Sequence, residues 1–311
     1  MPAYDYDDIA LIPQYFKGTS RSQLNTSVRV GDHWFKLPVI PANMKCVIDV
    51  DSARTLQSNG YFYVMHRFDI DSVSFVEQCY NEKWNTCSIS VGVKERDRQV
   101  IVSLANKKLS PHFITVDIAH GHCSAMRDML KHIKQHLPKT FIIAGNIATT
   151  SAYEDLQSWG ANAIKCGIGP GKSCTTKLKT GFFTPMFTSI KFIRSNARIQ
   201  NTLLIADGGI QHNGDIAKAM VAGADLVMIG SMFAQCVDSP AVSINGEKVY
   251  YGSASAENKS IQKNIEGRKL LIESNGMTYL QKMQEITEDL QSSISYAGGS
   301  LSIDTPYMVL T

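Results

Sequence analysis

Short apolar segments alternate with amphipathic stretches along most of the chain. The apolar segments run almost without interruption, which indicates strands buried on both faces, as in a parallel sheet. The stretches between them repeat apolar residues at helical spacing, for example at Met126, Met129, Leu130, Ile133 and Leu137 before Pro138, and predict covering helices. Eight strands are predicted in this way: Leu37–Ile40, Tyr61–Met65, Cys87–Val91, Phe113–Asp117, Phe141–Gly145, Ala163–Cys166, Leu203–Ala206 and Leu226–Ile229.

The spacing of these segments predicts the fold class. Most predicted strands begin about 22 to 28 residues apart, which is the length of one strand–helix unit. Eight such units predict an α/β protein with a single (β/α)8 (TIM) barrel over residues 1–311, and an open doubly wound sheet is the alternative. Residues 238–276 are polar and predict a flap. A final helix is predicted by Leu280, Met283, Ile286, Leu290 and Ile294, with a glycine stop at Gly298 and Gly299.

Composition narrows the class of protein. Of the 311 residues, 44% are apolar and 19% are charged, as in an ordinary globular protein. The net charge of +3 comes from scattered basic residues, so we expect no nucleic-acid partner. No long apolar run occurs, so we expect no membrane segment. Seven cysteines at irregular spacings form no disulfide framework, which favours a cytoplasmic protein with free thiols.

A glycine-rich loop follows the sixth predicted strand, with the sequence GIGPGKSCTT at residues 167–176. Its glycines allow the main chain to approach a ligand closely. Cys174 is a candidate nucleophile because nearby lysines favour the thiolate, and the hydroxyl of Thr176 can handle a proton. The alternative is a tight turn in which Cys174 is one more buried thiol.

Glycines also follow the seventh and eighth predicted strands, in Asp207-Gly208-Gly209 and Gly230-Ser231. In a barrel these strand ends form a recurring phosphate site made of main-chain N–H groups, and Asp207 can accept hydrogen bonds from ribose hydroxyls. The glycines can instead serve only the turns into the next helices. Asp117 and Asn146 end the fourth and fifth segments on the same rim, either as ligand contacts or as helix caps.

Taken together, these residues resemble the family of inosine monophosphate (IMP) dehydrogenases and guanosine monophosphate (GMP) reductases. The resemblance extends over essentially the whole chain. The matching motifs are Pro41–Met44, Met65–Arg67, Val116–Gly121, Ala144–Asn146, GIGPGKSCTT (167–176), ADGGI (206–210), MIGSMFA (228–234) and Asn264–Gly267. It implies a covalent adduct between the cysteine and carbon 2 of a purine.

Three features favour the branch of this family that reduces GMP to IMP and ammonia with NADPH, in purine salvage. No regulatory domain is inserted after Arg67, so a single catalytic domain is expected. No Arg-Tyr pair, which the dehydrogenases use to activate water, occurs between Ala254 and Glu266. Residues 291–299 resemble the shorter bacterial members that reduce GMP.

The resemblance also implies a role for each site residue. In catalysis, Cys174 adds to the purine, and Thr176 with Glu266 manages the proton that expels ammonia. The nucleotide substrate is held by Asp207, Gly208, Gly209, Gly230, Ser231, Asn146, Ser253, Ala254 and Gly267. NADPH is held by Ser20, Arg21, Arg67, Asp117, Ile118, Ala119, Ile168 and Gly169, where the first two serve a neighbouring subunit of a homotetramer. A monovalent cation such as K+ is held by Gly169, Gly171 and Cys174.

Some positions depart from the animal members of the family. A loop serine that contacts phosphate is Lys172 here, a base-recognising Met-Ser pair is Ser253-Ala254, and a flap arginine is Lys263. Two other functions therefore stay open: a short IMP dehydrogenase without the regulatory insert, and a barrel that binds purine nucleotides without turnover. The joint presence of Cys174, Thr176 and Glu266 argues against a mere sensor.

Overall fold

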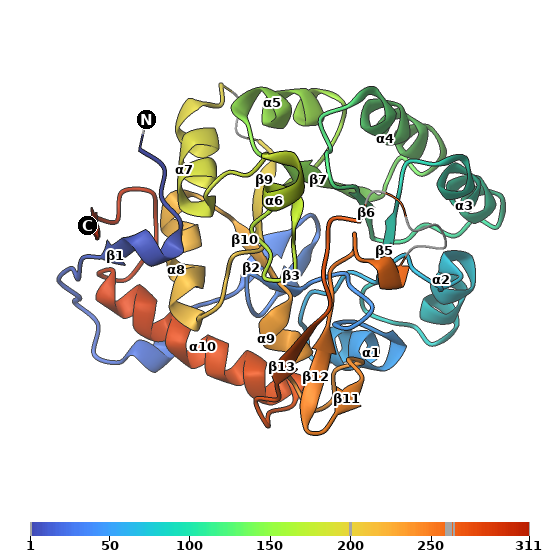
Figure 1. Ribbon diagram of the computed structural model, residues 1–311. Helices are drawn as coiled ribbons and strands as arrows, with labels where there is room; N and C mark the ends of the chain where they lie inside the picture. The colour runs from blue at the N-terminus through green and yellow to red at the C-terminus, as the bar shows by residue number, and fades with distance from the viewer. Residues whose placement is uncertain (1, 199–200, 259–262, 264, 311) are drawn as a thin grey trace.

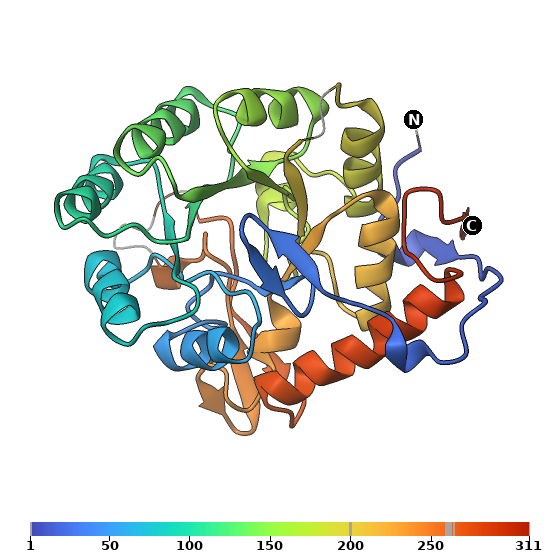
Figure 2. The same ribbon diagram turned by 180° about the vertical axis from the view of Figure 1, so that it is seen from behind.

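A curled parallel sheet forms the centre of the computed structural model, which describes residues 2–198, 201–258, 263 and 265–310 (Figures 1 and 2). Its strands follow the order β4-β10-β9-β8-β7-β6-β5, so neighbours in the chain are neighbours in the sheet and β10 returns to pair with β4. The strands are β4 (Val39–Pro41), β5 (Ser88–Val91), β6 (Phe113–Asp117), β7 (Phe141–Ile147), β8 (Ala163–Cys166), β9 (Leu203–Asp207) and β10 (Leu226–Ile229).

The longer helices surround the outside of the curl, as Figure 1 shows. This arrangement differs from a doubly wound sheet, which carries helices on both faces. The predicted barrel class is therefore confirmed. The helices are α1 (Val50–Ser58), α2 (Ser72–Asn81), α3 (Glu95–Asn106), α4 (Ser124–His136), α5 (Thr150–Ser158), α6 (Thr176–Thr180), α7 (Met186–Asn196), α8 (Asn213–Ala222), α9 (Ser231–Ala234) and α10 (Tyr279–Tyr296).

The second predicted strand, Tyr61–Met65, differs from the expectation. Its residues are buried, but in the described part of the chain the segment is no strand of the sheet, which has seven strands and not eight. It contacts β5 through three hydrogen bonds: from Met65 N–H to the Ser88 carbonyl (3.2 Å), from Ser90 Oγ to the Met65 carbonyl (2.6 Å), and from Ser88 N–H to the Tyr63 hydroxyl (3.2 Å). The apolar pattern therefore identified a buried segment correctly, but burial alone does not create a hydrogen-bonded ladder.

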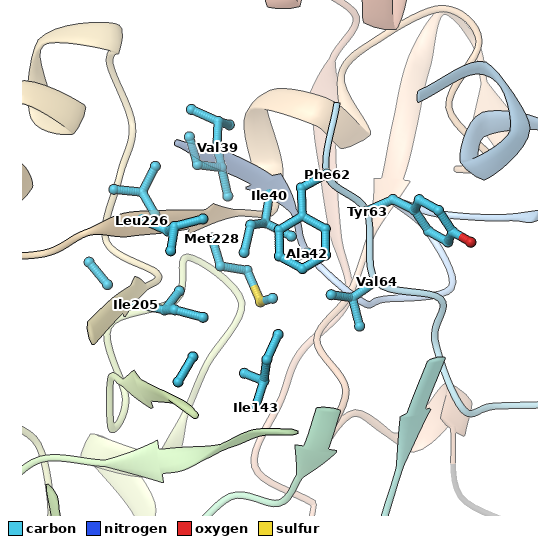
Figure 3. Close-up of a cluster of buried hydrophobic side chains, with 14 of the residues drawn as sticks. Val39, Ile40, Ala42, Phe62, Tyr63, Val64, Ile143, Ile205, Leu226 and Met228 are labelled. Atoms are coloured by element: carbon cyan, nitrogen blue, oxygen red, sulfur yellow. The ribbon is translucent and has the colours of Figure 1, made fainter. Parts of the chain in front are cut away.

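The interior of the curl is filled by side chains from several strands. In Figure 3, Ile143, Ile205 and Met228 come from β7, β9 and β10 and lie in one buried cluster with Phe62 and Val64. Each of these side chains is almost completely buried. The barrel is therefore packed below its rim, which leaves the carboxyl ends of the strands as the place for a ligand.

Helix α4 shows how the sequence determines an outer helix. Met126, Met129, Leu130 and Ile133 are fully buried on one face, and the helix ends at His136, before Pro138. Helix α10 is capped at its N-terminus by Thr278, whose side chain accepts from the Gln281 N–H. The helix buries Tyr279, Met283, Ile286, Leu290 and Ile294. Leu280, which the pattern assigned to the apolar face, is instead exposed.

The predicted flap holds regular structure that the sequence did not indicate. The strands β11 (Ser243–Ile244), β12 (Glu247–Tyr250) and β13 (Leu270–Glu273) form a three-stranded antiparallel sheet at one side of the barrel (Figure 1). The remaining elements are the pairs β1 (Ile9–Leu11) with β14 (Tyr307–Val309) and β2 (Val28–Val30) with β3 (His33–Phe35), and the 3-10 turns η1 (Tyr6–Asp8), η2 (Arg21–Gln23) and η3 (Ala256–Asn258).

Candidate active site

The carboxyl ends of β6 to β10 converge on two adjoining cavities of about 300 and 360 Å³. Cys174 lines both cavities, together with Gly169, Pro170, Gly171, Gly208, Gly230 and Tyr250. The smaller cavity extends toward the glycines after β9 and β10, and the larger one toward Arg67 and Asp117. The Cys174 thiol therefore lies where the two cavities meet, and each cavity is large enough to hold part of a ligand.

The glycine-rich loop is fixed to the far end of the flap by main-chain contacts. Cys174 forms an antiparallel bridge with Gly267. On either side, Thr175 N–H donates to the Glu266 carbonyl and Arg268 N–H donates to the Ser173 carbonyl, each at 2.9 Å. These bonds bring together residues about 90 positions apart in the chain.

The three predicted catalytic side chains form one hydrogen-bonded chain. The Sγ of Cys174 donates to Oγ1 of Thr176 at 3.1 Å, and that hydroxyl donates to Oε2 of Glu266 at 2.6 Å. All three residues are half-buried and line the larger cavity. A thiol, a hydroxyl and a carboxylate in this order provide a path along which a proton can leave the sulfur and reach a base.

The smaller cavity has the features of a phosphate site. It is lined by Gly208, Gly209, Gly230 and Ser231, as the sequence predicts, and Lys172 stands at its edge. Gly208 and Gly209 have φ angles of +95° and +81°, which glycine adopts without strain. Main-chain groups near a cation are well suited to an anion.

Tyr250 and Arg268 are among the residues of this cavity that sequence reasoning missed. Tyr250 ends β12 and is buried, and burial raises the pKa of its phenol well above the ordinary value. The hydroxyl therefore stays protonated and can donate a hydrogen bond. A β-carbon on Gly230 would lie only 2.5 Å from this oxygen, so the glycine is required for the tyrosine to approach.

A buried ionic network lies beneath the larger cavity. Nζ of Lys165, on β8, binds Oδ1 of Asp117 at 2.6 Å and Oδ2 of Asp207 at 3.0 Å. Nδ2 of Asn146 donates to the same Asp207 oxygen at 2.9 Å and to the Gly167 carbonyl at 2.8 Å. Burial alone would raise the pKa of Asp117, but the Lys165 ammonium and the Arg67 guanidinium lower it below the ordinary value. Hydrogen bonds from Lys165 therefore hold both carboxylates in place at the floor of the site.

Most of the residues predicted to bind the cofactor line the larger cavity: Arg67, Asp117, Ile118, Ala119, Ile168 and Gly169. The substrate residues Asn146, Ser253, Ala254 and Gly267 line it as well. The buried Nε of Arg67 and Oδ1 of Asn146 have no hydrogen-bond partner among the described residues. Unpaired buried polar atoms in a cavity wall fit a polar ligand that completes them.

Ser20 and Arg21 are not brought to either cavity. They lie at the 3-10 turn η2, which packs against α10, and Ser20 Oγ is hydrogen-bonded to Ser22 Oγ at 2.8 Å. Asn264, part of the motif before Gly267, lies outside the described residues.

The predicted cation loop consists of main-chain carbonyls. The Gly171 carbonyl accepts from Cys174 N–H at 2.9 Å, which leaves it one further lone pair, and Gly169 has φ +83°. In the described ranges no three His, Cys, Asp or Glu side chains are grouped as for a metal ion. A cation here would depend on carbonyl oxygens, the donors that hard cations prefer.

Gly167, which joins β8 to the loop, cannot carry a side chain. It has φ +155°, and a β-carbon would lie 2.1 Å from the Asp207 carbonyl oxygen. We expect Gly167→Ala to lower the free energy of unfolding by about 3 kcal/mol, because strain and a main-chain clash add.

Gly181→Ala is the control, since its φ of +78° is also unfavourable for alanine but nothing lies within 4 Å of the added β-carbon. This variant should lose about 1 kcal/mol. Urea unfolding of the two variants measures the difference, and equal losses would show that the clash with Asp207 does not exist.

The fold and site define a barrel whose rim places a cysteine, hydrogen-bonded to a hydroxyl and a carboxylate, beside a glycine-lined cavity suited to an anion. The chain belongs to the IMP dehydrogenase / GMP reductase family, whose model matches residues 3–305. Three similar proteins are named GMP reductase. The one from Streptococcus pyogenes serotype M4 is 51% identical over 96% of this chain and 91% of its own length. Those from Leptothrix cholodnii and Paracidovorax citrulli are 49% and 47% identical, over 96% and 98% of this chain and 92% and 94% of their own lengths.

Proposed function

We propose that this protein catalyses the reductive deamination of GMP to IMP and ammonia with NADPH, and so serves purine salvage. The observation that carries the proposal is the hydrogen-bonded chain from Cys174 through Thr176 to Glu266, placed where the two cavities meet. The relatives named GMP reductase, about half identical over nearly the whole chain, support the same reaction.

The first half of the reaction uses the Cys174 side chain as nucleophile. Its proton passes through Thr176 to Glu266, and the thiolate forms a bond to carbon 2 of the guanine. Glu266 then returns a proton through Thr176 to the amino group, and the bond from carbon 2 to nitrogen breaks as ammonia leaves. The product of this half is a thioimidate on Cys174.

In the second half of the reaction, the bond between carbon 2 and the sulfur of Cys174 is broken. When bound, NADPH supplies a hydride to carbon 2. Cys174 then leaves as the thiolate and is reprotonated. The sum balances as GMP, NADPH and two protons giving IMP, NADP+ and ammonium, so no further oxidant or reductant is required.

The two cavities divide the ligands between them. The 5′-phosphate of GMP would occupy the smaller cavity, on the main chain of Gly208, Gly209, Gly230 and Ser231, where Lys172 and Tyr250 add charge and a hydrogen bond. Asp207 would hold the ribose. The nicotinamide would lie in the larger cavity near Asp117, Ile118 and Ala119, with Arg67 nearby.

The proposal includes the cellular location, the domain organisation and the oligomeric state of the enzyme. Seven free thiols support a cytoplasmic location, and among the described helices none is both long and apolar enough to cross a bilayer. We propose one catalytic domain with a flap, and a homotetramer in which Ser20 and Arg21 of one subunit face the dinucleotide of the next. Their position away from both cavities of their own chain supports this arrangement.

One assay separates this function from its alternatives. Purified protein with GMP and NADPH should oxidise the cofactor and release ammonia under reducing conditions. IMP with NAD+ and no ammonia should not turn over continuously, because the Arg-Tyr pair that would activate water is missing. Continuous NADH production would identify a short dehydrogenase, and nucleotide binding without turnover in either mixture would identify a sensor.

We also propose that the glycine-rich loop binds K+ through main-chain oxygens of Gly169, Gly171 and Cys174. The expected result is a higher turnover in KCl than in NaCl at equal ionic strength, because a smaller cation fits carbonyl spacing for K+ poorly. Rates that depend on ionic strength alone would contradict a specific cation site.

A further inference from the structure

Lys165 is a buried charge that the proposed reaction steps do not use. It lies on β8 with a side chain only 2% exposed, and its ammonium contacts Asp117, Asp207 and the sulfur of Met228. Burial disfavours the charged form, yet the carboxylates of Asp117 and Asp207 raise its pKa above the ordinary value for lysine. Lys165 is therefore a permanent cation in the interior of the barrel.

The two carboxylates bound by Lys165 belong to different parts of the site. Asp117 ends β6 and lines the larger cavity beside Ile118 and Ala119, and Asp207 ends β9 next to the glycines of the smaller cavity. Strand β8 lies directly beside β9 and two strands away from β6. The Lys165 ammonium thus contacts one carboxylate on the proposed dinucleotide side of the rim and one on the proposed ribose side.

The hydrogen bonds leave Asp207 in a defined orientation. Lys165 and Asn146 both donate to its Oδ2, and among the described residues no group donates to its Oδ1. A carboxylate held by one oxygen presents the other in a fixed direction, where its two lone pairs can accept hydrogen bonds from the hydroxyls of a diol. Arg67 also acts on the Asp117 side, but Asp207 has no cation other than Lys165 in the described part of the network.

We propose that Lys165 is a positioning residue that orients Asp207 toward the substrate ribose and Asp117 toward the dinucleotide, so that one buried cation supports both binding sites. This inference rests on the proposed function and deepens it. Removing the ammonium leaves two carboxylates within reach of each other and without their shared counterion, so both must turn away or take up protons.

Calorimetric titration of GMP and of NADP+, each alone, tests this role without requiring turnover. Lys165→Met and Lys165→Gln should each weaken both ligands by at least about tenfold. Asp207→Asn should weaken mainly GMP, and Asp117→Asn mainly NADP+. Lys165→Arg keeps a cation between the carboxylates and should stay within about threefold of the unaltered protein for both ligands.

A purely structural role gives a different pattern. If no neutral variant folds, or if a folded neutral variant binds both ligands normally or loses only one, the positioning role is overturned. Equal losses in Lys165→Arg and Lys165→Met would overturn it as well. Failure of the proposed function would be seen elsewhere, as the absence of GMP-dependent NADPH oxidation by the unaltered protein.

Discussion

Replacement of Cys174 by alanine is expected to reduce turnover by at least about 10⁴-fold, because no covalent adduct can form without the sulfur. The side chain lines both cavities but is small, and its main-chain bridge to Gly267 does not depend on the thiol. GMP should therefore still bind with an affinity close to that of the unaltered protein.

Steady-state NADPH oxidation and titration of GMP measure the two quantities separately. Cys123→Ala provides a matched control, since Cys123 is a half-buried free thiol that precedes α4 and lines neither cavity. This control should retain full activity. Substantial turnover by Cys174→Ala would remove the residue from the mechanism.

Replacement of Glu266 by glutamine should slow the release of ammonia by about 10²- to 10⁴-fold, because the amide cannot accept the proton that Thr176 passes to it. Hydride transfer should suffer less, since it needs no proton on the leaving nitrogen. Glutamine keeps the shape of the side chain, so the contact to Thr176 and the main-chain bonds to the loop remain.

The two steps can be measured apart. Ammonia release follows from GMP with NADPH, and the hydride step follows from IMP with NADP+, which should give one NADPH per site as the thioimidate forms in reverse. Glu257→Gln, an exposed carboxylate in the 3-10 turn η3 of the flap, is the control and should behave as the unaltered protein. Equal losses in both steps would contradict the division of labour between Glu266 and the hydride donor.

Much of the site could be predicted because glycines mark the ends of strands. A buried strand followed by Gly208 or Gly230 indicates where the main chain turns and where an anion can approach. The hydrophobic pattern likewise located the segments of the sheet and the apolar faces of α4 and α10. It did not distinguish the extended segment Tyr61–Met65 from a strand, because hydrogen-bond pairing depends on neighbours that a local pattern does not contain.

The remaining features depend on contacts between distant residues. Nothing in the local sequence of Glu266 places it beside Cys174, and only the family resemblance suggested that contact. Likewise, nothing in the local sequence of Tyr250 places it beside Gly230. The flap strands were missed because β11, β12 and β13 are short and carry polar residues among the apolar ones. Lys165 lies within the predicted strand Ala163–Cys166, and its two carboxylate partners became visible only in the folded sheet.

The central claim is that carbon 2 of the purine loses its amino group and gains a hydride while bound through Cys174. The most direct test supplies GMP with NADPH deuterated at the transferred position and analyses the products by mass spectrometry. We predict IMP with one deuterium at carbon 2 and one ammonium for each NADPH oxidised, and neither product from Cys174→Ala. Unlabelled IMP, or cofactor oxidation without ammonium, would contradict the proposed reaction.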